Sequence, residues 1–221
     1  MPNIVARLLP GLIAVSFIVA GAGCSKQAKS ARHLGEGNRY FAAQDYDKAE
    51  VEYKNAFQAD ANNAEAIGRL GVIYLEQGRM AQAFPFLRRA IELKPELLEA
   101  RLKLGMLQLG TGRPQEARES AEFVLTRQPT DPEAPLLLAE GTTNAEEANA
   151  ARAFLRGLPA PAPTSAPVLV GLGMIDLRSN NPAGAKALFE QALAADPKYG
   201  AAHAALGRYH LIQRNNAEAG K

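Results

Sequence analysis

Small and apolar residues recur along this chain with a fixed spacing of 34 positions. Small residues let two antiparallel helices approach closely, while the larger residues of the pattern fill the remaining gap. A period of this length predicts a row of two-helix units. Four series keep the same register: Gly37, Gly71 and Gly105; Ala49, Ala83 and Ala117; Tyr53, Leu87 and Ala121; Ala56, Ala90 and Val124.

The first three units are expected over residues 30–63, 64–97 and 98–131. Gly78 and Gly112 stand where the second and third hairpins must turn, because glycine adopts the left-handed backbone of a tight turn without strain. In the first unit, Gly37-Asn38-Arg39-Tyr40 followed by Asp45-Tyr46-Asp47-Lys48-Ala49 resembles the tetratricopeptide-repeat (TPR) family. The resemblance implies an all-α, right-handed superhelix of about six helical hairpins that acts by binding.

The pattern weakens in the fourth unit and then returns. Residues 132–142 predict a first helix, and the capping box from Thr143 to Glu146 predicts a second one that ends near Gly157. Units one to four thus occupy 30–158, and the proline-rich stretch 159–165 predicts an extended connector. Units five and six occupy 166–221, with Asn181 capping a helix that starts at Pro182 and a sixth unit that ends at Lys221 midway through its second helix. The register returns at Gly173, Ala185, Phe189, Ala192, Pro197, Gly207 and Ala219.

The N-terminal stretch, residues 1–23, has the pattern of a secretory signal. Arg7 precedes an apolar run over 8–20, and small residues stand directly before Cys24. A membrane-spanning helix needs about 20 apolar residues, so an uncleaved anchor is the alternative rather than the first interpretation. Residues 21–24, Gly-Ala-Gly-Cys, resemble a bacterial lipobox, although Gly21 replaces the usual leucine.

That second resemblance implies that Cys24 is acylated and begins the mature chain, with residues 24–29 as a tether. Ser25 after the cysteine implies outer-membrane sorting, so we expect a lipid-anchored protein of the bacterial envelope that faces the periplasm. An ordinary thiol is the alternative for Cys24. Because the chain has one cysteine, its fold must form without an intramolecular disulfide.

Composition narrows the class of function. Hydrophobic residues make up 47% of the chain, and the net charge is only +2 with both signs interspersed, so we expect no nucleic-acid partner. The three histidines lack metal-ligand spacing, and His203 and His210 are expected to pack within the repeats. No nucleophile elbow, phosphate loop or paired-carboxylate motif appears, so we expect no enzyme activity, cofactor, metal or small-molecule substrate.

Binding is the function that the TPR resemblance implies, because the first helix of each unit lines a concave groove. Such an apolar groove suits a peptide or an amphipathic helix of a partner protein. The other interpretation is that neighbouring repeats or a further helix cover these side chains. Of the polar residues that clamp a peptide carboxylate in some TPR modules, only Asn38 is present. The groove positions are Leu34, Asn38, Phe41, Val72, Leu75, Leu102, Met106, Leu109, Val170, Met174 and Leu177.

We therefore expect a membrane-anchored scaffold lipoprotein. Similar lipoproteins serve exopolysaccharide export, pilus secretin assembly or outer-membrane protein insertion, which implies a role in envelope assembly or export. One alternative is that the array is the N-terminal recruiting arm of a longer enzyme such as a glycosyltransferase. Another is a cytoplasmic or inner-membrane adaptor with an uncleaved leader.

Overall fold

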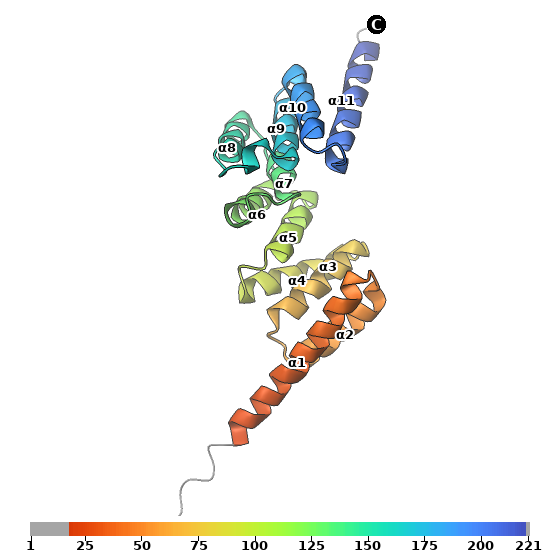
Figure 1. Ribbon diagram of the computed structural model, residues 1–221, viewed down its shortest axis with the longest axis vertical. Coiled ribbons are helices and arrows are strands. Elements are labelled where there is room, and N and C mark those ends of the chain that lie inside the picture. Colours follow the sequence, from red (N-terminus) through yellow and green to blue (C-terminus); the bar gives the residue numbers. More distant parts are fainter. Residues whose placement is uncertain (1–17, 220–221) are drawn as a thin grey trace, which may run out of the picture.

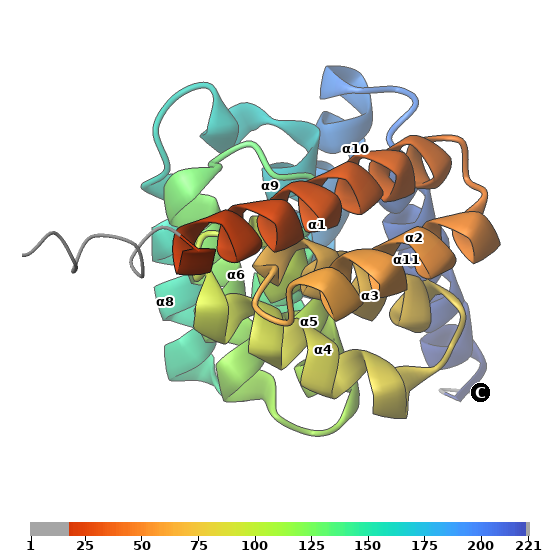
Figure 2. The same cartoon turned by 90° about the horizontal axis from the view of Figure 1, so that it is seen from below.

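The computed structural model describes residues 18–219, which form α-helices and one short 3-10 helix and contain no strand. The helices pair into hairpins that follow one another along the long axis (Figure 1) and change direction from one hairpin to the next (Figure 2). The predicted all-α solenoid is confirmed. The first three hairpins are α1 (Ile18–Ala42) with α2 (Tyr46–Ala59), α3 (Ala64–Glu76) with α4 (Met80–Leu93), and α5 (Leu98–Gly110) with α6 (Pro114–Arg127).

The rest of the array is less regular. It comprises α7 (Ala134–Glu140), α8 (Ala145–Arg156), the 3-10 helix η1 (Ala162–Thr164), α9 (Ala166–Arg178), α10 (Pro182–Ala195) and α11 (Gly200–Ala219). Helix α7 has 7 residues, about half the length of the first helices around it, which have 13. The first helix of the fourth unit, expected over residues 132–142, is thus shortened to Ala134–Glu140, in the unit where the repeat pattern weakens.

A left-handed residue turns each regular hairpin at the same point of the repeat. The φ angle is 59° at Gln44, 73° at Gly78, 77° at Gly112 and 58° at Asn180, and these positions lie one or two periods of 34 apart. The predicted turns at Gly78 and Gly112 are confirmed. The corresponding position of the fourth unit, Glu146, lies inside α8 instead.

Paired small and large residues hold the two helices of a hairpin together. A Cβ atom added to Gly71 would lie 2.7 Å from Cγ of Leu87, so only glycine admits this approach. Gly37 meets the ring of Tyr53 in the same way, and Gly173 meets that of Phe189. Each large partner is fully buried, which explains why the series keep their register.

The hydrophobic core divides into two clusters that meet at α5. The first core cluster runs from Ala49 to Leu107. The second core cluster runs from Leu102 to Ala205. Helix α5 contributes Leu104 to the first and Leu102 to the second, as expected of a solenoid in which each hairpin contacts its neighbours.

The N-terminal helix begins earlier than the first unit does. Helix α1 starts at Ile18, so residues 24–29, the predicted tether, are helical. Residues 1–17 of the predicted signal segment lie outside the described part of the chain. Between residues 18 and 219, no helix combines the length and the apolar character that crossing a membrane requires.

Three local predictions were wrong. Residues 159–165 are not extended, because the φ that proline imposes also fits a 3-10 turn, and η1 closes with the Ser165 amide donating to the carbonyl of Ala162 at 3.0 Å. The cap of α8 is Asn144, whose side chain accepts from the Glu147 amide, one position after the predicted capping box. Helix α11 runs unbroken from Gly200 to Ala219, where a turn into a second helix was expected. The predicted cap at Asn181, with Pro182 in the first turn, is confirmed.

Candidate protein-binding groove

Two adjoining pockets follow the first helices of units one to four. The α3–α5 pocket has a volume of about 340 Å³ and draws residues from α1, α3, α5, the first residue of α2 and the loop between α6 and α7. The α5–α7 pocket has a volume of about 400 Å³ and lies between α5, α7 and the start of α11. Pro132 and Glu133 line both pockets, so we treat them as one continuous surface, the inner groove. Four successive first helices facing one hollow is the concave surface expected of this architecture.

Five of the predicted groove residues line these pockets. Phe41, Val72 and Leu102 line the α3–α5 pocket, and Met106 and Leu109 line the α5–α7 pocket. Val72 and Leu102 are mostly buried, at 3% and 5% exposure, and form the floor. The repeat register thus places Phe41 and Leu109, which are 68 positions apart in the chain, along the same groove.

The other predicted positions do not line these pockets. Val170 and Met174 are 1% and 3% exposed in the second core cluster, and Leu177 packs against that cluster, so the alternative of cover by neighbouring repeats describes this part of the array. Leu34 and Leu75 are half-buried against the first core cluster. The amide oxygen of Asn38 accepts a hydrogen bond from the Tyr53 hydroxyl at 2.8 Å, which engages it within its own unit.

Helices α7 and α11 also contribute to the groove, at positions that were not predicted from the sequence. Leu136 and Glu140 follow Leu102 and Met106 by one period of 34, so extending the register into the fourth unit would have found them. The wall formed by Tyr199 and Ala201 has no such signal, because it depends on how far the array curves. The missed lining residues of the α5–α7 pocket are Gly110, Pro132, Glu133, Leu136, Leu137, Glu140, Tyr199 and Ala201.

A hydrogen bond across two units joins two residues that line the α5–α7 pocket. The Tyr199 hydroxyl, just before α11, donates to the backbone carbonyl of Pro132, just before α7, at 2.6 Å. Burial raises the pKa of Tyr199, and the nearby carboxylates of Glu133, Asp131 and Asp196 raise it further. The phenol therefore stays protonated and able to donate at neutral pH.

Carboxylates outnumber cationic groups along the groove. Its lining includes Glu76, Glu99, Asp131, Glu133 and Glu140, but only one basic residue, Lys103. The Lys103 ammonium lies 3.0 Å from the Glu133 carboxylate and 3.9 Å from that of Glu76. A guanidinium outside the lining, that of Arg69, lies 2.6 Å from the Glu99 carboxylate. Asp131 is occupied in capping α7, where it accepts from the amides of Glu133 and Ala134.

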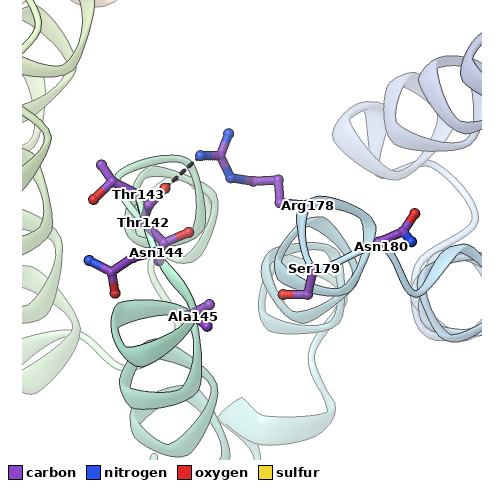
Figure 3. Close-up of a pocket in the computed structure, with 8 residues that line it drawn as sticks. Thr142, Thr143, Asn144, Ala145, Arg178, Ser179 and Asn180 are labelled. Carbon is purple, nitrogen blue, oxygen red and sulfur yellow. Dashed lines mark hydrogen bonds between the residues drawn. The ribbon is translucent and has the colours of Figure 1, made fainter.

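A separate polar pocket of about 370 Å³ lies between the start of α8 and the end of α9 (Figure 3). Two hydrogen bonds engage Thr142, one of its lining residues. The Arg178 guanidinium donates to the carbonyl of Thr142 at 2.5 Å, and the Thr142 hydroxyl donates to the carbonyl of Ala139 at 2.8 Å. The hydrogen bond between Arg178 and Thr142 joins α9 of the fifth unit to the segment that precedes α8 in the fourth unit.

The histidines are not brought together. Nδ1 of His33 lies 2.6 Å from the Glu52 carboxylate, which joins α1 to α2. His203 and His210 are exposed, so the expected packing was wrong: in the part of α11 whose side chains are described, the face that carries Ala202 and Ala205 packs against the array. Over the described residues, no group of three or more His, Cys, Asp or Glu side chains is placed to hold a metal ion.

Comparison with known proteins agrees with this architecture. One family model for the tetratricopeptide repeat matches residues 34–97 and 170–221, and a second matches 74–122 and 108–170. DnaJ homolog subfamily C member 3 of Rattus norvegicus is 34% identical over 122 residues, which is 55% of this chain and 24% of that protein. BBSome complex member BBS4 of Bos taurus is 33% identical over 103 residues, 47% of this chain and 19% of that protein. The chain thus spans a quarter or less of the length of these relatives.

Solved structures of similar fold include YrrB, described as a TPR protein with an unusual peptide-binding site. Its TM-score is 0.61 at 16% identity, over 87% of this chain and 100% of YrrB. The MamA protein has a TM-score of 0.59 at 20% identity, over 77% of this chain and 93% of MamA. Identities this low support the fold alone, whereas the two family models together follow the repeats from residue 34 to residue 221. The chain belongs to the tetratricopeptide-repeat family.

Proposed function

We propose that this protein is a membrane-anchored scaffold that holds a segment of a partner protein in the inner groove. The observation that carries the proposal is the pair of adjoining pockets, about 340 and 400 Å³, that four successive first helices line. Two pockets in a row suit a chain segment that places more than one side chain. The described peptide-binding site of YrrB, a protein of similar fold, supports the same role.

The chemistry of the lining favours a protein segment over a small polar ligand. Met106, Leu109 and Leu136 are partly exposed within the α5–α7 pocket, and an unbranched methionine side chain adapts to different partners. Carboxylates stand beside these apolar side chains, which gives the groove an apolar floor and a polar rim. This combination is typical of interfaces between proteins.

The proposed anchor is an acyl group on Cys24, which would hold the protein at the outer membrane, facing the periplasm, in an envelope assembly or export system. The lipobox-like residues 21–24 support this proposal. Helix α1 is continuous from Cys24 to Ser30, a rise of about 9 Å. The first hairpin would then stand close to the lipid surface on a rigid connection.

The groove is tested by in-cell crosslinking from a photoreactive residue placed at Leu136. We expect Met106→Glu combined with Leu109→Lys to abolish a discrete crosslinked product, because both changes put charge on the apolar floor. A matched control is Val51→Glu with Met80→Lys, at exposed apolar positions that line neither pocket, which should leave the product unchanged. Undiminished crosslinking in a groove variant of normal helix content would contradict the proposal.

The anchor is tested by the intact mass of the protein purified from membranes. We expect Cys24→Ala to remove the mass of the acyl groups and to release the protein from the membrane fraction, because several acyl chains together give lasting attachment. Ser25→Ala keeps the cysteine and serves as the control. An equal acyl mass in the Cys24→Ala protein would rule out lipidation at this residue.

A further inference from the structure

The α5–α7 pocket also indicates what kind of segment binds there. Its lining contains two carboxylates, Glu133 and Glu140, and no basic residue. The whole chain has a net charge of +2, so this acidic character is local and does not follow from composition. A local excess of one charge sign in a groove selects and steers partners of the opposite sign.

The two carboxylates are placed to contact a ligand. Glu133 directly precedes α7 and Glu140 ends it, so they flank the apolar residues Leu136 and Leu137. Their side chains are 45% and 37% exposed. Between the described residues, the ion pairs of these carboxylates are a contact of 3.0 Å between Glu133 and Lys103 and a looser one of 3.7 Å between Glu140 and Arg208. Both carboxylates keep acceptor sites free, since each can accept about four hydrogen bonds.

The floor between these carboxylates is built for an apolar side chain. Met106, Leu109 and Leu137 form it, and the Tyr199 ring stands at one side. The Tyr199 hydroxyl donates to the carbonyl of Pro132, which helps to hold the ring at the edge of the pocket that it lines. A pocket of about 400 Å³ can receive a leucine or phenylalanine side chain.

We infer that the α5–α7 pocket binds a cationic segment of the partner protein, with one bulky apolar side chain on the pocket floor and lysine or arginine residues against Glu133 and Glu140. This inference rests on the proposed protein-binding role of the inner groove and names the class of its ligand. It argues against recognition of a peptide's terminal carboxylate in this pocket, because the pocket lining contains no basic residue and the nearby Lys103 and Arg208 already face Glu133 and Glu140.

The test measures fluorescence anisotropy of labelled heptapeptide amides with the full-length protein in detergent. The probes are Lys-Lys-Leu-Phe-Leu-Lys-Lys, its analogue with four glutamates in place of the lysines, and Lys-Lys-Ser-Gly-Ser-Lys-Lys. We expect the first peptide to bind at least about tenfold more tightly than either of the others, which is about 1.4 kcal/mol. Its affinity should fall as salt is raised.

Charge variants locate the binding. Glu133→Gln with Glu140→Gln should weaken the first peptide about three- to tenfold, whereas Glu119→Gln with Glu146→Gln should not, since those exposed carboxylates line neither pocket. Equal or tighter binding of the acidic peptide would overturn the charge assignment, and equal binding of the Ser-Gly-Ser peptide would overturn the apolar anchor. Loss of the in-cell crosslink in the groove variant without preference for the first peptide would overturn this inference and leave the proposed function intact. A crosslink that the groove variant does not change would instead overturn the proposed function.

Discussion

Units one to three and units four to five solve the same packing problem in different ways. In units one to three, ion pairs join neighbouring units at nearly constant separations along the chain: Arg79 with Glu50, Arg69 with Glu99, and Arg127 with Glu96. Each hairpin there also turns at one left-handed residue. The same kinds of ion pair and turn are repeated there, so the contacts of one unit can be predicted from those of the next.

Unit five keeps this turn, at Asn180, but the attachment of the fourth unit to its neighbours adds contacts that occur once. Arg118 of α6 lies 2.5 Å from the Glu147 carboxylate and also donates to the carbonyl of Gly141 at 3.0 Å. Arg152 of α8 donates at 2.8 Å to Asp176, a mostly buried carboxylate of α9. Where the fourth unit lost its left-handed turn and half of its first helix, specific polar contacts replace the repeated packing. The comparison teaches that an array tolerates a degenerate unit when its neighbours supply polar partners for it.

The largest effect is expected from removing the fully buried ring of each region. Tyr53→Ala and Phe189→Ala act at equivalent positions, four periods apart, and each should cost about 3–5 kcal/mol because the cavity cannot close. Since a solenoid unit contacts only its neighbours, Phe189→Ala should raise amide exchange in α9 and α10 and leave α2 protected. Hydrogen exchange measures this directly. A uniform rise across both regions would show that the array unfolds as one unit.

The next effect concerns pH and the attachment of the fourth unit to α6 of the third. The pKa of Glu147 is lowered from 4.5 to about 2, first by the amide and hydroxyl of Thr143 and then by Arg118. A carboxyl with a lowered folded pKa stabilises the fold above pH 4.5, and this contribution is lost as the pH falls from 4.5 to about 2. Glu147→Gln should therefore lower the urea midpoint at pH 7 and match the natural protein near pH 2. A constant difference over that range would contradict the assignment.

The smallest effect tests the turn itself. Gln44 and Glu146 occupy the same register, but Gln44 has a φ of 59° whereas Glu146 lies in a helix. Gln44→Gly should stabilise the protein by up to about 1 kcal/mol, because a left-handed backbone strains side chains other than glycine. Glu146→Gly should destabilise it by about 0.5–1 kcal/mol. Thermal melting of both variants measures whether each change raises or lowers the melting temperature. A shift in the same direction for both variants would refute the proposed difference between the units.

The packing and the turns of the repeated units could be predicted from the sequence, because each of them requires a particular type of residue at a fixed position of the repeat. Gly71 and Gly112 are examples, the first for close approach and the second for backbone conformation. The position of Met106 in the groove followed from the same register. The wall formed by Tyr199, the burial of Met174 and the exposure of His203 could not be predicted in this way. They depend on how the hairpins curve in space. The curvature of the array is the total of small rotations between successive units, so no single residue type in the sequence indicates it.

The hydrogen bond from Tyr199 to Pro132 has a mechanical consequence. It joins two points 67 positions apart and makes the intervening helices a closed ring, while the hairpins before it form an open coil. We expect tension along the long axis to separate the hairpins before Pro132 first, because this hydrogen bond does not join them. The same hydrogen bond helps the α5–α7 pocket to keep its shape, because it joins two of the residues that line the pocket.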